Sequence, residues 1–245
     1  NKDRYLRLWH FLADRYKDSS AVAGYDVLNE PVVKIREEKV VRELYERVTK
    51  EIRDADKRHI IFLEGNFWAQ RINFLGRPKD DNTAYSIHAY PPTNFTFNLV
   101  RDLRYPGKAH EVTLNKKMFN VLARPYRNFV EKYGVHLYAG EFGVNARDGY
   151  YGEIRWVDDI LKAFTKNNLS WTYWTYKTIA NSVYPDGIYR YLANPPWVKR
   201  EGPVYGWENF ASQWPKEKGR MIFSWRTENF TLNKKLLAVL KRYFK

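Results

Sequence analysis

Apolar residues recur along the chain in two kinds of spacing, which predict helices and strands. Helical spacing predicts five amphipathic helices, at residues 3–17, 37–56, 115–133, 151–165 and 232–244. Short apolar runs predict five strands, at 21–28, 59–63, 85–89, 136–139 and 169–176. A stretch rich in Pro, Gly, Tyr and Trp, residues 177–219, is predicted to be one long loop.

The alternation of these strands and helices predicts an α/β fold, with a parallel sheet covered by helices. Long loops with polar and aromatic residues follow the strands. They favour a (β/α)8 barrel (TIM barrel), whose functional site lies at the carboxyl ends of its strands. A doubly wound sheet is the alternative, but it usually has a glycine-rich phosphate loop after one strand, and this sequence has none.

A closed barrel needs eight strands, and the pattern provides five. The outer strands, near Val22 and Trp171, would then have open edges, which proteins usually avoid. We therefore expect residues 1–245 to be a single domain that supplies roughly strands 4–8 of a barrel and their helices. About three further strand–helix units would come before Asn1 or from another chain.

Composition narrows the possible classes of protein. The net charge is +14 and the pI is about 9.7, which would suit a nucleic-acid-binding protein. Basic and acidic residues alternate in the predicted helices, however, as over residues 34–53, so we expect ion-paired helix faces and no nucleic-acid partner. The absence of Cys excludes disulfides and zinc–thiolate sites. Few thermolabile residues among many ionic ones favour a thermostable protein. No apolar stretch is long enough for a membrane span.

Two carboxylates stand where predicted strands end. Glu30 ends the run Gly-Tyr-Asp-Val-Leu-Asn-Glu, and Glu141 lies in Tyr-Ala-Gly-Glu-Phe-Gly. A carboxylate in such a place is costly unless it is paired, hydrogen-bonded or used in chemistry. Hydrolysis of a glycosidic bond needs two of them, one as an acid and one as a nucleophile or base. The alternatives are a helix start at Asn29-Glu30-Pro31 and a buried ion pair at Glu141.

A histidine and several aromatic residues accompany the carboxylates. His88 and Tyr90 end a third predicted strand, where His88 could hold a proton or a substrate hydroxyl near neutral pH. Trp174 could form a stacking floor for a sugar, whereas Trp171 is predicted to belong to the barrel core. The alternative for His88 is a core histidine. Asn66 and Trp68 are weaker candidates of the same kind. The long loop also contains Trp197, Trp207 and Trp214, which could shape a cleft.

Taken in order, four motifs resemble glycoside hydrolase family 5, the cellulase family of retaining enzymes built on (β/α)8 barrels. They are Asn29-Glu30-Pro31, His88-Ala89-Tyr90, Gly140-Glu141-Phe142-Gly143 and Trp171-Thr-Tyr-Trp174. The resemblance covers essentially the whole chain. It implies that Glu30, at the end of barrel strand four, is the acid/base and that Glu141, at the end of strand seven, is the nucleophile.

The same resemblance implies roles for the other residues and for the whole protein. Asn29 would bind the sugar 2-hydroxyl, His88 and Tyr90 would line the catalytic centre, and Trp174 would form a platform at the cleaved sugar. The implied function is that of an extracellular, secreted endo-β-1,4-glucanase that acts on polysaccharides or oligosaccharides and needs no cofactor or metal. The alternatives are a β-mannanase, another family 5 β-glycosidase, or a non-catalytic carbohydrate-binding remnant of such a barrel.

Overall fold

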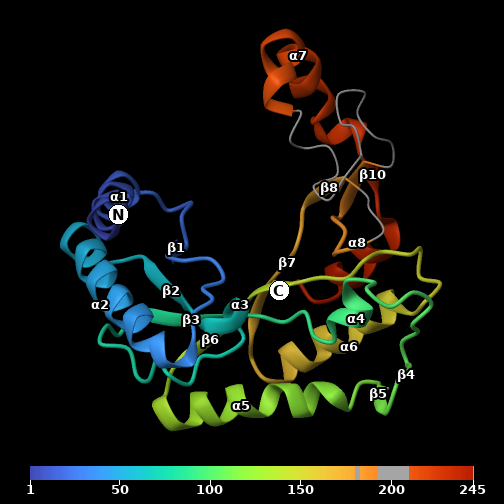
Figure 1. Cartoon of the computed structure of the whole chain (residues 1–245), viewed down its shortest axis with the longest axis horizontal. Helices are drawn as coiled ribbons and strands as arrows, with labels where there is room; N and C mark the ends of the chain where they lie inside the picture. Colours follow the sequence, from blue (N-terminus) through green and yellow to red (C-terminus); the bar gives the residue numbers. More distant parts are fainter. Residues whose placement is uncertain (180–182, 192–209, 245) are drawn as a thin grey trace. The chain divides into compact units, whose positions relative to one another are not determined.

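The computed structural model describes residues 1–179, 183–191 and 210–244 (Figure 1). The chain forms two compact units. Unit 1 contains residues 1–89, 119–142 and 164–172, and unit 2 contains residues 90–118, 143–163 and the described part of 173–245. Two of the loop tryptophans singled out in the sequence, Trp197 and Trp207, lie outside the described residues.

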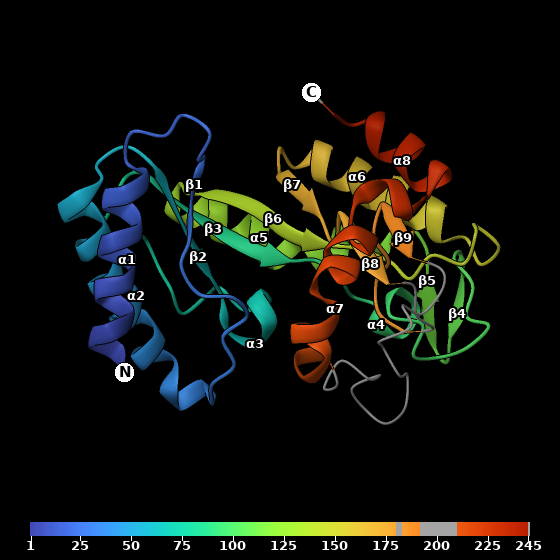
Figure 2. The same ribbon diagram turned by 90° about the horizontal axis from the view of Figure 1, so that it is seen from above.

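A five-stranded sheet forms the centre of unit 1. Its strands follow the order β1 (Gly24–Asp26), β2 (Ile60–Glu64), β3 (Thr83–His88), β6 (His136–Phe142) and β7 (Ser170–Tyr173). The pairs β1–β2, β2–β3 and β3–β6 are parallel, and Figure 2 shows these four strands side by side. The predicted parallel sheet is confirmed, and every predicted strand matches one of its strands.

Three helices of unit 1 accompany this sheet: α1 (Lys2–Tyr16), α2 (Glu38–Ala55) and α5 (Met118–Tyr133). The first two pack against each other at the N-terminal end of the unit (Figure 1). On α5, the ring of Phe129 packs edge-on against Tyr85 of β3, with 5.2 Å between the ring centroids. A short 3₁₀ helix, Ile35–Glu37, precedes α2. Apolar residues on one helix face thus cover the sheet, as the helical spacing predicted.

A buried carboxylate fixes the connection from α2 to β2. The helix ends at Ala55, and the next residue, Asp56, takes an extended conformation. Burial opposes ionisation of Asp56, but hydrogen bonds from the Tyr25 hydroxyl and from the backbone N–H groups of Arg58 and His59 lower its pKa to about 2. Asp56 therefore stays ionised and ties β1 to the start of β2.

Unit 2 contains most of α6 (Glu153–Lys166), together with α4 (Thr93–Thr96), α7 (Phe210–Ser224) and α8 (Lys234–Lys241). A hairpin joins β4 (Gly107–Ala109) to β5 (Val112–Leu114). A second small sheet has the order β10 (Thr231–Leu232), β9 (Tyr189–Tyr191), β8 (Lys177–Ile179). A short 3₁₀ helix, Thr227–Asn229, precedes β10. At the start of α6, the buried Glu153 accepts hydrogen bonds from the backbone N–H groups of Arg147, Gly149 and Tyr151.

The prediction of one unbroken loop over residues 177–219 is wrong. This stretch contains β8, β9 and the first part of α7. Its strands are only three residues long, and the sequence around them is rich in residues that usually break regular structure, so periodicity could not reveal them. The predicted strand at 21–28 is also shorter than expected, at Gly24–Asp26.

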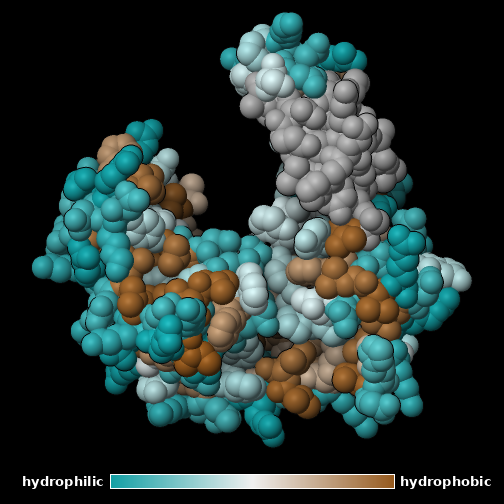
Figure 3. Space-filling view, viewed as in Figure 1, coloured by the Kyte–Doolittle hydropathy of each residue, from teal (hydrophilic) through white to brown (hydrophobic). Residues whose placement is uncertain are grey.

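Hydrophilic side chains make up most of the face in Figure 3, with hydrophobic ones scattered over both units. On α1, for example, Leu8 and Phe11 are 51% and 59% exposed. Isolated exposed apolar residues are common in folded proteins, so we assign them no function. Among the described residues, no helix combines the length and the hydrophobicity needed to cross a bilayer.

Candidate functional site

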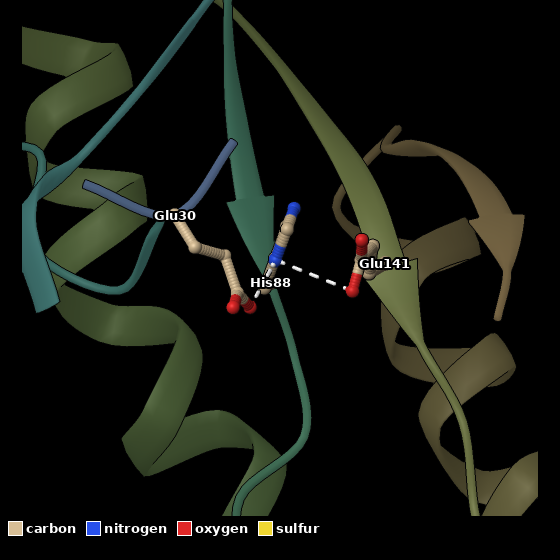
Figure 4. Close-up of side chains that lie close together, drawn as sticks. All are labelled: Glu30, His88 and Glu141. Carbon is tan, nitrogen blue, oxygen red and sulfur yellow. Dashed lines mark hydrogen bonds and ion pairs between the residues drawn. The ribbon is translucent and has the colours of Figure 1, made fainter. Parts of the chain in front are cut away.

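Three side chains converge at the carboxyl end of the sheet in unit 1. Glu30 follows β1, His88 ends β3 and Glu141 lies near the end of β6, and all three point toward one another (Figure 4). The Nδ1 atom of His88 lies 2.7 Å from Glu30 Oε1 and 3.4 Å from Glu141 Oε2. One oxygen of each carboxylate and this ring nitrogen lie within 4.8 Å of one another. The structure thus brings together the two carboxylates that the sequence singled out.

An irregularity in the sheet sets the position of His88. The register between β3 and β6 shifts between Ile87 and His88, so that His88 pairs with Glu141. The next residue, Ala89, donates its backbone N–H to the carbonyl oxygen of Glu141 at 2.7 Å. Such irregularities re-aim side chains at strand ends and are frequent beside functional sites.

Glu30 has an unusual backbone conformation. Its φ angle is 46°, in the left-handed region that few residues other than glycine adopt. Its backbone N–H donates to Oε2 of the Glu64 side chain at 2.5 Å. Strained residues of this kind persist only where the surrounding structure holds them, and they cluster at functional sites.

Glu64 is a residue of this site that the sequence analysis missed. It is buried, and its Oε1 atom lies 3.1 Å from His88 Nε2. The signal was present, because Glu64 directly follows the apolar run 59–63, just as Glu30 and Glu141 follow theirs. The two residues predicted from this segment, Asn66 and Trp68, come two and four positions after it.

Four carboxyl groups shape the electrostatics around His88. Burial by itself opposes the charged imidazolium, but Glu64, Glu30 and Glu141 together raise the pKa of His88 to about 9. His88 is therefore positively charged near neutral pH, and both of its ring N–H groups act as donors. Burial and the neighbouring Glu64 raise the pKa of Asp26 to about 8.

A cavity of about 1050 Å³ borders these groups and is lined by residues of unit 1. Asp26, Asn29, Glu64, His88 and Glu141 are among its lining residues. The cavity also reaches the first residues of the strands, such as Gly24, Ile60 and Thr83, so it follows the inner face of the sheet, which side chains fill in a closed barrel. The predicted sugar ligand Asn29 thus borders the same cavity as the carboxylate of Glu141.

The atoms of Glu30, His88 and Glu141 are also close enough together to ligate one metal ion. Nitrogen and carboxylate donors of this kind suit several divalent cations. The same three groups are engaged with one another, and hydrolysis by two carboxylates requires no metal. We assign no metal to the site.

Asn66 is the one predicted sugar ligand that the structure contradicts. It is fully buried, and its side-chain amide donates to the Val33 carbonyl and to Glu38 Oε1. Its Oδ1 atom accepts the backbone N–H groups of Val33 and Phe67. All the polar atoms of this amide are occupied, so Asn66 anchors the segment after Glu30 and is not available to a substrate.

The other predicted residues are divided between the two units. Trp68, in α3 (Asn66–Ala69) of unit 1, is 54% exposed and remains a candidate for sugar stacking. Tyr90 and Trp174 belong to unit 2, where Tyr90 is buried against the ring of Phe97 and Trp174 is 48% exposed just after β7. Trp214 lies in α7 and is 36% exposed.

Comparisons with known proteins identify relatives of this chain. The sequence model described as Cellulase (glycosyl hydrolase family 5) matches residues 1–179. A beta-xylosidase from Phanerodontia chrysosporium is 32% identical over 73% of this chain and 38% of its own length. Endoglucanase C from Acetivibrio thermocellus is 26% identical over 74% of this chain and 61% of its own.

Among solved structures, the endoglucanase Cel5A from the hyperthermophile Thermotoga maritima superimposes with a TM-score of 0.69. It is 25% identical, and the match covers 98% of this chain and 66% of that enzyme. Cel5A has also been solved with mannotriose and with cellobiose. The chain thus spans between 38% and 66% of the length of these proteins. Its parallel sheet and helices are part of a (β/α)8 barrel, as the sequence predicted.

Proposed function

Because the chain belongs to the cellulase family, glycosyl hydrolase family 5, we propose that it carries the catalytic centre of a retaining β-glycosidase. The separation of the two carboxylates supports this proposal most directly. Oxygens of Glu30 and Glu141 lie within 4.8 Å of each other. Retaining enzymes hold these groups about 5–5.5 Å apart, whereas inverting enzymes leave about 6.5–9.5 Å for a water molecule.

The first step would form a covalent intermediate. Glu30, in its protonated form, gives its proton to the leaving glycosidic oxygen while a carboxylate oxygen of Glu141 attacks the anomeric carbon. The bond from the anomeric carbon to the leaving oxygen breaks, and a bond from the same carbon to Glu141 forms. In the second step the ionised Glu30 takes a proton from water, which attacks the anomeric carbon and releases Glu141.

His88 would hold the two carboxylates in place and compensate the negative charge that they carry in turn. Its Nδ1–H lies between them, closer to Glu30 at 2.7 Å than to Glu141 at 3.4 Å. A positive imidazolium compensates the negative charge of Glu141 before the attack. It would also stabilise Glu30 when Glu30 becomes ionised after proton transfer.

We propose β-1,4-glucan as the substrate, because two of the relatives are named endoglucanases. β-Mannan is the second candidate, since Cel5A of Thermotoga maritima has been solved with mannotriose. The subsite loops decide between these polymers, and the fold does not. Polysaccharides such as β-1,4-glucan do not cross a cell membrane unaided, which supports an extracellular location for the enzyme.

We also propose that full activity requires a complete barrel. The parallel sheet of the described residues has five strands, and a (β/α)8 barrel has eight. Three further strand–helix units, supplied by the same or another chain, would close the sheet and add residues around the cavity. The activity should therefore be measured with the longest protein that the source gene encodes, and compared with that of residues 1–245 alone.

The experiment follows hydrolysis of 2,4-dinitrophenyl β-cellobioside and β-mannobioside by ¹H NMR. Retention predicts that the β-anomer of the sugar product appears first and then mutarotates. The variant Glu141→Ala should lose at least about 10³-fold in kcat, and azide should restore turnover with an α-azide product. Initial release of the α-anomer, or near-native rates for Glu141→Ala, would overturn the proposal.

A further inference from the structure

Glu64 lies behind the two catalytic carboxylates, at the end of β2, and only 2% of it is exposed. Its two carboxylate oxygens contact two different groups of the site. Oε2 accepts the backbone N–H of Glu30 at 2.5 Å, and Oε1 lies 3.1 Å from His88 Nε2. Its backbone carbonyl oxygen accepts the Tyr45 hydroxyl, which fixes the end of the strand. We propose that Glu64 is a positioning residue, which holds Glu30 and the charged ring of His88 in the arrangement that the reaction needs.

The contact with His88 requires a carboxylate. An ionised carboxylate only accepts hydrogen bonds, so Glu64 favours a proton on Nε2 of the ring. Nδ1 then needs a second proton to remain a donor toward Glu30 and Glu141, and this makes the ring an imidazolium. Glu64 would therefore set the charge of His88 as well as its orientation.

The contact with Glu30 acts on the backbone. The φ angle of Glu30 is 46°, which a residue with a side chain adopts only when its surroundings hold it there. A hydrogen bond from its N–H to a charged acceptor is of the stronger kind. Loss of this bond would allow Glu30 to relax and its carboxyl group to move away from the glycosidic oxygen.

Asp26, on β1, is the remaining acidic group beside Glu64, to which its side chain is hydrogen-bonded. Desolvation and the neighbouring Glu64 raise its pKa to about 8, which favours a proton between the two carboxyl groups. The acidic groups that face His88 are thus Glu64 on β2, Glu30 after β1 and Glu141 on β6. Of the glutamates that contact this ring, Glu64 is the most deeply buried.

The test uses Glu64→Gln in the longest available protein. The amide can accept through one atom only, and its NH₂ group must face either the Glu30 N–H or the His88 ring. We expect kcat to fall about tenfold to a hundredfold, with KM changed by less than about threefold. Where the alkaline limb of the kcat profile reports loss of the proton from His88, it should move to lower pH. In an NMR titration, the pKa of His88 should fall by at least about one unit from its value near 9.

Two further variants make the result specific. Glu153→Gln changes another buried glutamate that binds backbone N–H groups, but in unit 2, and should lower stability without moving the pH profile. Glu64→Asp keeps the charge and shortens the side chain by one methylene. It should leave the pKa of His88 close to the native value while kcat still falls about tenfold, and it decides the matter if Glu64→Gln does not fold.

The inference rests on the proposed function, but the two can fail separately. The histidine titration needs no substrate, so it tests whether Glu64 holds the charged ring even if the protein hydrolyses no glycoside. A native pKa of His88 in Glu64→Gln would overturn the inference. Native kcat in either Glu64 variant would overturn it as well.

Discussion

The side chain of Asn66 is expected to hold the loop that carries Glu30, and Asn66→Ala tests this. The amide makes four hydrogen bonds: two with the backbone of Val33, one with Glu38 and one with the Phe67 N–H. Val33 is only three positions after Glu30. The substitution removes all four bonds at a site that is fully buried.

The magnitude follows from these bonds. Each is worth about 1 kcal/mol net, and a buried group left without a partner costs about 1–3 kcal/mol. Val33 is partly exposed, so water can replace some of the lost partners. We therefore expect Asn66→Ala to lower the free energy of unfolding by about 2–4 kcal/mol, and hence to lower Tm by roughly 5–15 °C.

The assay combines thermal unfolding with kinetics. If the loop shifts Glu30 by a fraction of an ångström, kcat should fall about tenfold or more. Asn229→Ala is the matched control, because Asn229 is exposed and makes one side-chain hydrogen bond, to the Phe223 carbonyl. It should change the stability by no more than about 0.5 kcal/mol. An Asn66→Ala protein with native Tm and native kcat would refute the reasoning.

Two further predictions concern neighbours of the catalytic pair. Since the pKa of His88 is raised to about 9 in the folded protein, the stabilisation from its charge is present below about pH 6.5 and lost as the pH rises through about 9. Urea unfolding should show this loss, and His88→Gln should abolish it. A Cβ atom added at Gly140 would lie 2.4 Å from Ser86 Oγ, so Gly140→Ala should cost about 1–3 kcal/mol. Adding Ser86→Ala should recover part of that cost, and a double variant that is no more stable would contradict this view.

Much of the fold and the centre of the site could be predicted from the sequence. Short runs rich in apolar residues marked all five strands of the sheet, most clearly β3, which is buried throughout. A glutamate at the end of such a run is costly without a purpose, and this identified Glu30 and Glu141. Which edge of the sheet they share followed from the parallel arrangement of the strands.

What could not be predicted depends on contacts between distant residues. Asn66 and Glu64 are two positions apart after the same apolar run, and that run does not show which of them reaches His88. Only the folded chain shows that Asn66 binds Val33 and that Glu64 reaches His88 and Glu30. The register shift that aligns His88 with Glu141 has no pattern in the sequence either.

The short strands of unit 2 escaped prediction for a different reason. β9 pairs with β8 on one side and with β10 on the other, and β10 lies more than 30 residues further along the chain. A strand of three residues is too short to display a period. Its stability comes from pairing with partners that are distant in sequence.

The central claim is that Glu141 forms a covalent bond with the sugar. The most direct measurement is incubation of the protein with 2,4-dinitrophenyl 2-deoxy-2-fluoro-β-cellobioside, followed by peptide mass spectrometry. The electron-withdrawing fluorine slows both steps, and the good leaving group allows the intermediate to accumulate. The account predicts one added fluoroglycosyl group per chain, attached to Glu141, with loss of activity on the same time scale. A fully active enzyme that stays unlabelled, or a label on Glu30, would contradict it.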